Sequence, residues 1–341
     1  MNLRSLSTLP TWDWPDDAAD VIESALTDRR AAREDRMLAA VLASELIVGD
    51  DDLADSLLNI AGKGDEPQDL RAASAAALGP MLEYAESRDP VDEEPGLSDA
   101  AAERVQARLR ELYESAGTPA PVRRAALAAS ARAAEDWHHD AVRSAWAGGD
   151  PAWRLTAVEC MSSVAGFGDE ILQALGGDDP DLRFWAVRAA GNWEVDAAWP
   201  QVVGLLRSKT TDRETLMAAL EAAAEIRPHE APEVLGPLAD SSDEQIAMAA
   251  MDALDLAGAL LAEGEEDEGV DWDDDGDEEV EMRDDYEESV LGDDDLDDDD
   301  DLGDDDEDDL DDLDDEEFED DDDWEDDGDD VKDADEDDET Y

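Results

Sequence analysis

Apolar and polar positions follow the period of an α-helix from about residue 21 to residue 261. Small or apolar side chains recur at intervals of three and four residues, and Gly, Pro or Asp interrupts the pattern every 10–20 residues. Alternation of β-branched and polar residues, which is typical of strands, is scarce. The pattern therefore predicts many short amphipathic helices.

These helical segments repeat along the chain. Six of them align on an anchor residue: Leu70, Val122, Trp153, Leu182, Thr215 and Ile246. The steps between successive anchors are 52, 31, 29, 33 and 31 residues. In the first four segments the anchor is followed by Arg and a run of small residues. A fixed period of this kind is the signature of a repeat architecture.

Small residues fill two columns of the alignment. Four residues after the anchors stand Ser74, Ala126, Ala157, Ala186, Ala219 and Ala250. Seven residues after them stand Ala77, Ala129, Cys160, Ala189, Ala222 and Ala253. The fifth position is mostly larger: Ala75, Leu127, Val158, Val187, Leu220 and Met251. An earlier helix anchored at Arg36 would place Ala40, Val41 and Ala43 in these columns. Because this spacing defines one helical face, we expect neighbouring helices to approach closely through it.

A shorter helix is expected before each anchor, at 141–147, 170–175, 200–206 and 233–239. The loops GGDP (148–151) and GGDDP (176–180) separate two of these helices from the next anchor, with Gly ending one helix and Asp-Pro starting the other. The 52-residue step contains an acidic insertion at 87–96. After it, Ser98 and Asp99 are expected to cap a long helix that ends near Ser115.

A helix–turn–helix unit of about 31 residues with these columns resembles the HEAT repeat, in particular the HEAT-like repeats of phycobilin-lyase-type proteins. The resemblance covers residues 21–261. It implies an all-α fold, an α-solenoid of stacked antiparallel helix pairs that bury their apolar faces on one another. We expect an N-terminal arm or cap at 1–20 that includes Trp12 and Trp14, the solenoid at 21–262, and a disordered acidic tail at 263–341.

The chain carries 102 acidic and 24 basic side chains, a net charge of −78. Residues 263–341 hold 53 of the acidic and 2 of the basic ones, a composition that favours disorder. The charge argues against direct nucleic-acid binding, and the single Cys160 argues against a disulfide scaffold. No export signal is evident and no uninterrupted apolar run approaches ~18 residues, so we expect a cytoplasmic protein without a membrane span. Adaptation to high salt and a binding role are both open explanations of the acidity.

Few residues are candidates for catalysis. A resemblance to the deoxyhypusine hydroxylase type of HEAT-like enzyme would imply His-Glu pairs on successive repeats that hold two irons. Only His229-Glu230 has this dipeptide, and His138 and His139 are the remaining histidines. Cys160 lies in a column of small residues, where a packed thiol is expected. We therefore expect no catalytic site, no metal site and no cofactor.

Two sets of residues are candidates for partner binding. Arg71, Arg123, Arg154 and Arg183 occupy the same repeat position. They either pair with nearby acids such as Asp150, Asp179 or Asp181, or form a cationic ladder that binds an acidic segment, including the chain's own tail. The central repeats are also rich in tryptophan, with Trp153, Trp185 and Trp193 as candidate anchors. Trp185 interrupts a column of small residues, which predicts that it projects towards a groove.

The tail contains a repeated motif, DWDDDGD around Trp272 and DWEDDGD around Trp324. These two tryptophans are candidate anchors for a basic partner. The first copy also resembles the start of a calcium loop, but Met282 stands where the bidentate Glu is required.

Together these features predict a non-catalytic scaffold for protein–protein interaction, with a polyanionic tail for solubility or for the capture of basic segments. The expected partners are proteins, basic ones among them. One alternative is a chaperone or sequestering factor for basic proteins. The other is a HEAT-like lyase or hydroxylase-type enzyme, which the shortage of histidine disfavours.

Overall fold

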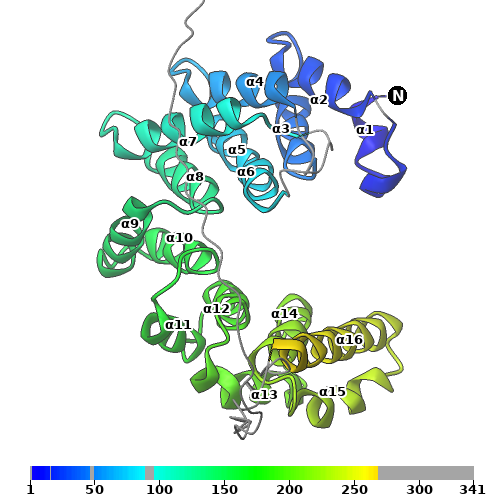
Figure 1. Ribbon diagram of the computed structural model, residues 1–341. Helices are drawn as coiled ribbons and strands as arrows, with labels where there is room; N and C mark the ends of the chain where they lie inside the picture. Colours follow the sequence, from blue (N-terminus) through cyan, green and yellow to red (C-terminus); the bar gives the residue numbers. More distant parts are fainter. Residues whose placement is uncertain (1, 16, 47–49, 89–95, 268–341) are drawn as a thin grey trace, which may run out of the picture. The chain divides into compact units, whose positions relative to one another are not determined.

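The computed structural model describes residues 2–15, 17–46, 50–88 and 96–267, with side chains described up to residue 262. The chain divides into two units, Met1–Asp274 and Asp275–Tyr341. The described residues, all in the first unit, form α-helices and two short 3-10 helices without any strand (Figure 1). The predicted all-α fold is therefore confirmed. Trp272, Trp324 and the rest of the predicted tail beyond residue 267 lie outside the described residues.

Seven helical hairpins make up most of the described chain. The first helices of the hairpins are α2 (Ala18–Thr27), α4 (Asp51–Gly62), α7 (Asp99–Glu114), α9 (Asp136–Ala147), α11 (Gly168–Leu175), α13 (Trp199–Arg207) and α15 (Ala231–Ala239). The second helices are α3 (Arg33–Ala43), α5 (Gln68–Ala76), α8 (Ala120–Ser130), α10 (Pro151–Met161), α12 (Pro180–Asn192), α14 (Arg213–Ile226) and α16 (Glu244–Asp267). The additional elements are α1 (Leu3–Leu6), η1 (Thr11–Asp13), α6 (Leu78–Ser87) next to the acidic insertion, and η2 (Asp196–Ala198).

The second helices form a continuous row, in which each packs against the next from α3 to α16 (Figure 1). The small residues of the predicted columns lie in this row: Ala126, Ala157, Ala186 and Ala219 are fully buried. Contact is close at Gly191 of α12, where an added Cβ would lie 2.9 Å from the Cα of Ala222 in α14. Small side chains thus allow the helix backbones to approach, as the column pattern predicted.

The predicted alignment of the first repeat was wrong by one residue. The Nε of Arg36 donates to the carbonyl oxygen of Leu26, ten residues earlier, as Arg71 donates to Ala61. Arg36 is therefore equivalent to the Arg that follows the anchor in the later repeats, such as Arg71, and Asp35 takes the place of their apolar anchor. The columns then contain Ala39, Ala40 and Leu42, which are buried, whereas Val41 is 49% exposed. A polar anchor removed the signal that aligned the other repeats.

The predicted caps are confirmed. The Asp150 side chain accepts a hydrogen bond from the backbone N–H of Ala152, and that of Asp179 accepts from Asp181, each just before a Pro that begins the helix. Ser98 caps α7 through the N–H of Ala101. Because these side chains satisfy N–H groups that lack a partner within the helix, they fix where α7, α10 and α12 begin.

The N-terminal end of the row of hairpins is covered by the first residues of the chain. The helix α1 contacts α2 and α3 and buries Leu3 and Leu6. The indole Nε1 of Trp14 donates to the carbonyl oxygens of Leu6 and Leu9, while Trp12 is exposed. Of the two tryptophans expected in the cap, only Trp14 therefore folds back.

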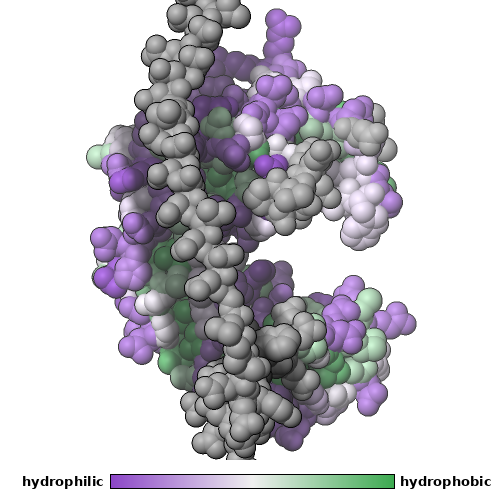
Figure 2. Space-filling model, in the orientation of Figure 1, coloured by the Kyte–Doolittle hydropathy of each residue, from purple (hydrophilic) through white to green (hydrophobic). Residues whose placement is uncertain are grey.

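The last helix, α16, continues to Asp267, past the predicted boundary at residue 262. It packs against α14 and α15, but Met251, whose column is buried in the hairpins from α5 to α14, is 49% exposed. Figure 2 shows apolar side chains at the surface in this part of the molecule. By length and composition alone, Glu244–Ala262 is also apolar enough to cross a membrane. It was not predicted from the sequence because Asp252 and Asp255 interrupt its apolar run.

Candidate functional site

Two adjoining hollows lie on the second helices of the last hairpins. The first, of ≈ 600 Å³, is formed by α12, α14 and α16, and its floor includes Phe184, Met217 and Leu256. The second, of ≈ 680 Å³, shares Phe184 and Glu214 with the first and adds Trp185 and, from α10, Leu155. We call the two hollows together the second-helix groove. Residues from hairpins about 31 positions apart in the sequence build it.

Aromatic side chains provide much of the groove floor. Phe184 and Trp185 lie two and three residues after the anchor of α12, and their rings meet edge to face with centroids 5.2 Å apart. The sequence predicted that Trp185 projects towards a groove, and the structure places it in the lining. Phe184, Met217 and Leu256 were not predicted as site residues, because each also fits the apolar face of an ordinary helix.

The rim of the groove is acidic. Glu214, Glu221 and Asp252 line the first hollow, and within the described residues none of them forms an ion pair. The two neighbouring cations are already engaged: Arg213 forms a bidentate pair with Asp243 at 3.0 Å, and the Arg188 guanidinium lies 5.9 Å from the centroid of Trp185. The groove thus combines an apolar floor with carboxylates that have no cationic partner in the described chain.

One further carboxyl close to these acids has a perturbed pKa. Burial, followed by the charge of Glu221, raises the pKa of Glu225 to about 7, while Arg188 acts in the opposite direction. The Glu225 carboxylate occupies the space over Gly191, where an added Cβ would clash with its Oε2. Near neutral pH this group therefore exchanges a proton, and its charge depends on the charges around it.

The four arginines predicted as a ladder all donate to backbone carbonyl oxygens. Their acceptors are Ala61 for Arg71, Tyr113 for Arg123, Trp146 for Arg154 and Gly177 for Arg183, at 2.9, 2.7, 3.2 and 2.7 Å. These carbonyls lie at or just beyond the C-terminal end of the first helix of each hairpin, where the helix leaves them without a partner. Within the described residues none of the four forms an ion pair with Asp150, Asp179 or Asp181, the acids suggested as partners, although the charge of Arg183 acts on Asp212 of the next turn.

A fifth member of the Arg column, Arg36, was missed as a site residue because of the alignment error. Its guanidinium donates to Glu66 through both Nη atoms, at 2.7 and 3.1 Å. Arg36 and Glu66 are only 7% and 8% exposed. The hydrogen bond from Arg36 holds the pKa of Glu66 below its usual range, with burial opposing it.

The remaining predicted tryptophans belong to hairpin junctions. The Arg123 guanidinium lies beside the rings of Tyr113 and Trp153, 5.6 and 5.5 Å from their centroids, and the two rings meet edge to face. The Nε1 of Trp193 donates to the carbonyl oxygen of Met161 at 2.7 Å. The structure thus joins Arg123 and Trp153 in one cluster and puts Trp185 in a separate groove.

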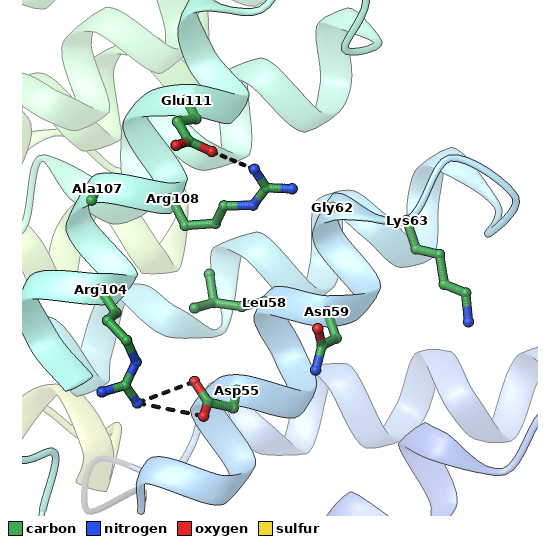
Figure 3. Close-up of a pocket in the computed structure, with 9 residues that line it drawn as sticks. All are labelled: Asp55, Leu58, Asn59, Gly62, Lys63, Arg104, Ala107, Arg108 and Glu111. Atoms are coloured by element: carbon green, nitrogen blue, oxygen red, sulfur yellow. Dashed lines mark hydrogen bonds and ion pairs between the residues drawn. The ribbon is translucent and has the colours of Figure 1, made fainter.

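A wider cleft of ≈ 910 Å³ lies between α4 and α7 (Figure 3). It contains three cations, but Arg104 lies 3.3 Å from Asp55, and Arg108 is paired with Glu111. Since internal acids offset the charge of these two arginines, this cleft offers a weaker basis for recognition than the second-helix groove.

The candidate catalytic groups have structural partners. His138 Nδ1 accepts from the N–H of Glu135 at 2.8 Å, its Nε2 lies 2.9 Å from Ser130 Oγ, and burial lowers its pKa. Cys160 is buried among the small columns, which raises the pKa of its thiol well above its usual value. Within the described residues, no three His, Cys, Asp or Glu side chains are placed to hold a metal ion.

Residues 168–255 match the family model of HEAT repeats, and no curated protein matches the chain. Among solved structures, human deoxyhypusine hydroxylase in complex with glycerol is similar at 16% identity, with a TM-score of 0.36 over 75% of this chain and 89% of that one. The YibA protein of E. coli is similar at 16% identity, with a TM-score of 0.38 over 74% and 95% of the two chains. A chain of the Kap95p–RanGDP structure is similar at 15% identity, with a TM-score of 0.36 over 74% of this chain and 42% of that one. The matched residues show that this chain contains HEAT repeats, and the helical hairpins continue the same architecture through the described residues.

Proposed function

We propose that this protein is a non-catalytic scaffold that binds a partner protein through the second-helix groove. The observation that carries the proposal is the pairing of an aromatic and apolar floor with unpaired carboxylates at the rim. Buried aromatic and apolar anchors supply most of the binding energy in protein interfaces, and charges around them select the partner.

The chemistry of the other residues supports binding over catalysis. Among the buried side chains, His138 and Cys160 are the types most often used in catalysis. His138 is hydrogen-bonded to the Glu135 backbone and to Ser130, and Cys160 is packed in the core. The groove itself contains carboxylates and two guanidinium groups but no histidine or cysteine. Its chemistry is that of a recognition surface.

The proposal is tested by affinity capture with three full-length chains: wild type, Leu256→Asp in the groove floor, and Met251→Asp on the same helix. A charged residue in the floor should weaken binding of the partner by about tenfold or more, because an apolar anchor is lost. Met251 is exposed and does not line the groove, so its variant should retain the partner.

Residues 263–341 are identical in the three chains, so proteins that bind to that acidic segment are captured equally by all of them. Circular dichroism verifies that each variant retains its helices. If Leu256→Asp captures the same proteins in the same amounts as wild type, the groove is not the binding surface and the proposal fails.

A further inference from the structure

We infer that the occupant of the second-helix groove is a basic amphipathic helix of the partner protein. The inference rests on the proposed function and specifies the charge and the backbone conformation of the bound segment. Two independent features of the groove lead to it: the state of its rim carboxylates, and the kind of element that forms its walls.

The rim carboxylates indicate the charge of the occupant. Glu214 and Glu221 lie seven residues apart on α14, and Asp252 lies across from them on α16. They flank apolar residues and have no ion-pair partner in the described part of the chain. Covering them with a neutral or acidic surface would remove their water without replacing it, whereas Lys or Arg side chains would compensate for the loss.

The walls indicate the backbone conformation of the occupant. They are formed by side chains of α10, α12, α14 and α16, whose backbone groups are paired within the helices or, at the starts of α12 and α14, capped by Asp179 and Asp212. An extended peptide lying on the apolar floor would bury N–H and C=O groups with no strand edge to pair with. A helix satisfies its own backbone groups, so it can enter such a groove without that cost.

The floor and rim together define the pattern of the bound helix. The floor residues are apolar, so the bound segment must present an apolar stripe to Phe184, Met217 and Leu256. An α-helix provides such a stripe with residues at i, i+3, i+4 and i+7. Lys or Arg on both sides of that stripe would then reach the carboxylates of α14 and α16. The bound segment is therefore apolar along one face and basic along its flanks.

Three synthetic peptides test the inference against the full-length protein at physiological salt. The first is a Leu/Lys amphipathic helix of roughly 18 residues, about five turns, with a benzophenone photo-cross-linker on its apolar face. The second has the same composition with two central D-residues that prevent a helix. The third has Glu in place of Lys. Mass spectrometry maps the cross-linked positions, which separates the groove from the acidic segment 263–341.

We expect the first peptide to cross-link to α12, α14 or α16 at the groove, and the other two to lose at least about tenfold of that signal. Equal labelling of the groove by the Glu peptide would overturn the basic character of the occupant. Equal labelling by the peptide with D-residues would overturn its helical conformation. No labelling of the groove by the first peptide would overturn the inference as a whole. The scaffold proposal is tested separately, with Leu256→Asp.

Two matched triple variants remove the same number of charges from different places. The groove variant carries Glu214→Gln, Glu221→Gln and Asp252→Asn, and the control carries Glu86→Gln, Glu103→Gln and Asp140→Asn at exposed positions elsewhere. The groove variant should lower the affinity for the first peptide at the groove about tenfold, and the control should leave it unchanged. Equal effects would mean that only the overall charge attracts the peptide, and the inference would fail.

Discussion

The Arg column of the second helices and the rim of the second-helix groove carry opposite charges. The arginines are paired with groups of the protein itself, and the rim carboxylates are not. Arg71, Arg123 and Arg154 donate to carbonyl oxygens at the ends of the first helices, and Arg123 also lies against two aromatic rings. The rim acids Glu221 and Asp252 have no such partners in the described residues. Both regions lie on the same row of second helices.

Regular spacing of a charged residue along the repeats therefore does not by itself predict a partner-binding site. A residue that recurs at one repeat position meets the same backbone environment in every hairpin, and here that environment is an unpaired carbonyl oxygen. Arg at this position therefore stabilises the hairpin. Carboxylates that no internal group satisfies are the stronger indication of a partner. The following predictions test this division.

The largest effect is expected for Arg36→Ala. Removing this side chain leaves the buried Glu66 carboxylate with only the longer ion pair to Arg29, at 3.6 Å, and should lower the free energy of unfolding by about 3 kcal/mol. The measurement is urea denaturation followed by circular dichroism. Arg33→Ala, which removes a solvent-exposed pair with Asp69, is the control and should cost less than about 1 kcal/mol. Similar losses for the two variants would contradict the buried pair.

A smaller effect is expected for Arg123→Ala, compared with Arg124→Ala. Arg123 donates to the Tyr113 carbonyl oxygen and lies against two aromatic rings, so its loss should cost about 1.5 kcal/mol of folding free energy. Arg124 lies over Trp153 without that hydrogen bond, and its loss should cost about 0.5 kcal/mol. If thermal and urea denaturation rank the two variants the other way round, the Arg column is not structural.

Protonation of Glu225 links the groove region to pH. Its pKa is about 7 in the folded protein against 4.5 as its ordinary value, so the folded state holds the proton more tightly. Stability should therefore fall as pH rises from 4.5 to about 7 and then level off. Glu225→Gln removes this loss and should raise stability by about 1 kcal/mol at high pH, with no gain below pH 4.5. Denaturation curves across this pH range that are parallel for the two proteins would show that Glu225 titrates normally.

The smallest effect on folding is expected for Glu221→Gln, at most about 0.5 kcal/mol, because this exposed carboxylate has no internal partner. Its charge nevertheless raises the pKa of Glu225, so the substitution should lower that pKa. The Glu225 carboxyl resonance, followed by NMR during a pH titration, reports the change. Glu103→Gln on α7 serves as the control and should leave the titration unchanged.

The sequence by itself determined the elements and their packing face. Helical period, Gly and Asp-Pro at the loops, and the small-residue columns are local features, and they correctly predicted α7, α10 and α12 with their caps. The columns also predicted the buried contact between second helices, because close approach of two helices requires small side chains wherever it occurs. Only the first repeat, with polar Asp35 at its anchor, was misaligned.

The tertiary structure decided which charges are satisfied and which remain open. An Arg at a helix start can reach a carboxylate, a carbonyl oxygen or solvent with almost equal ease, and only the position of the preceding helix end selects the carbonyl of Tyr113 for Arg123. Likewise Phe184, Met217 and Leu256 form one floor only because three hairpins stack in order. Periodicity acts over a few residues along one helix, whereas a binding surface depends on distances between helices that the period does not encode.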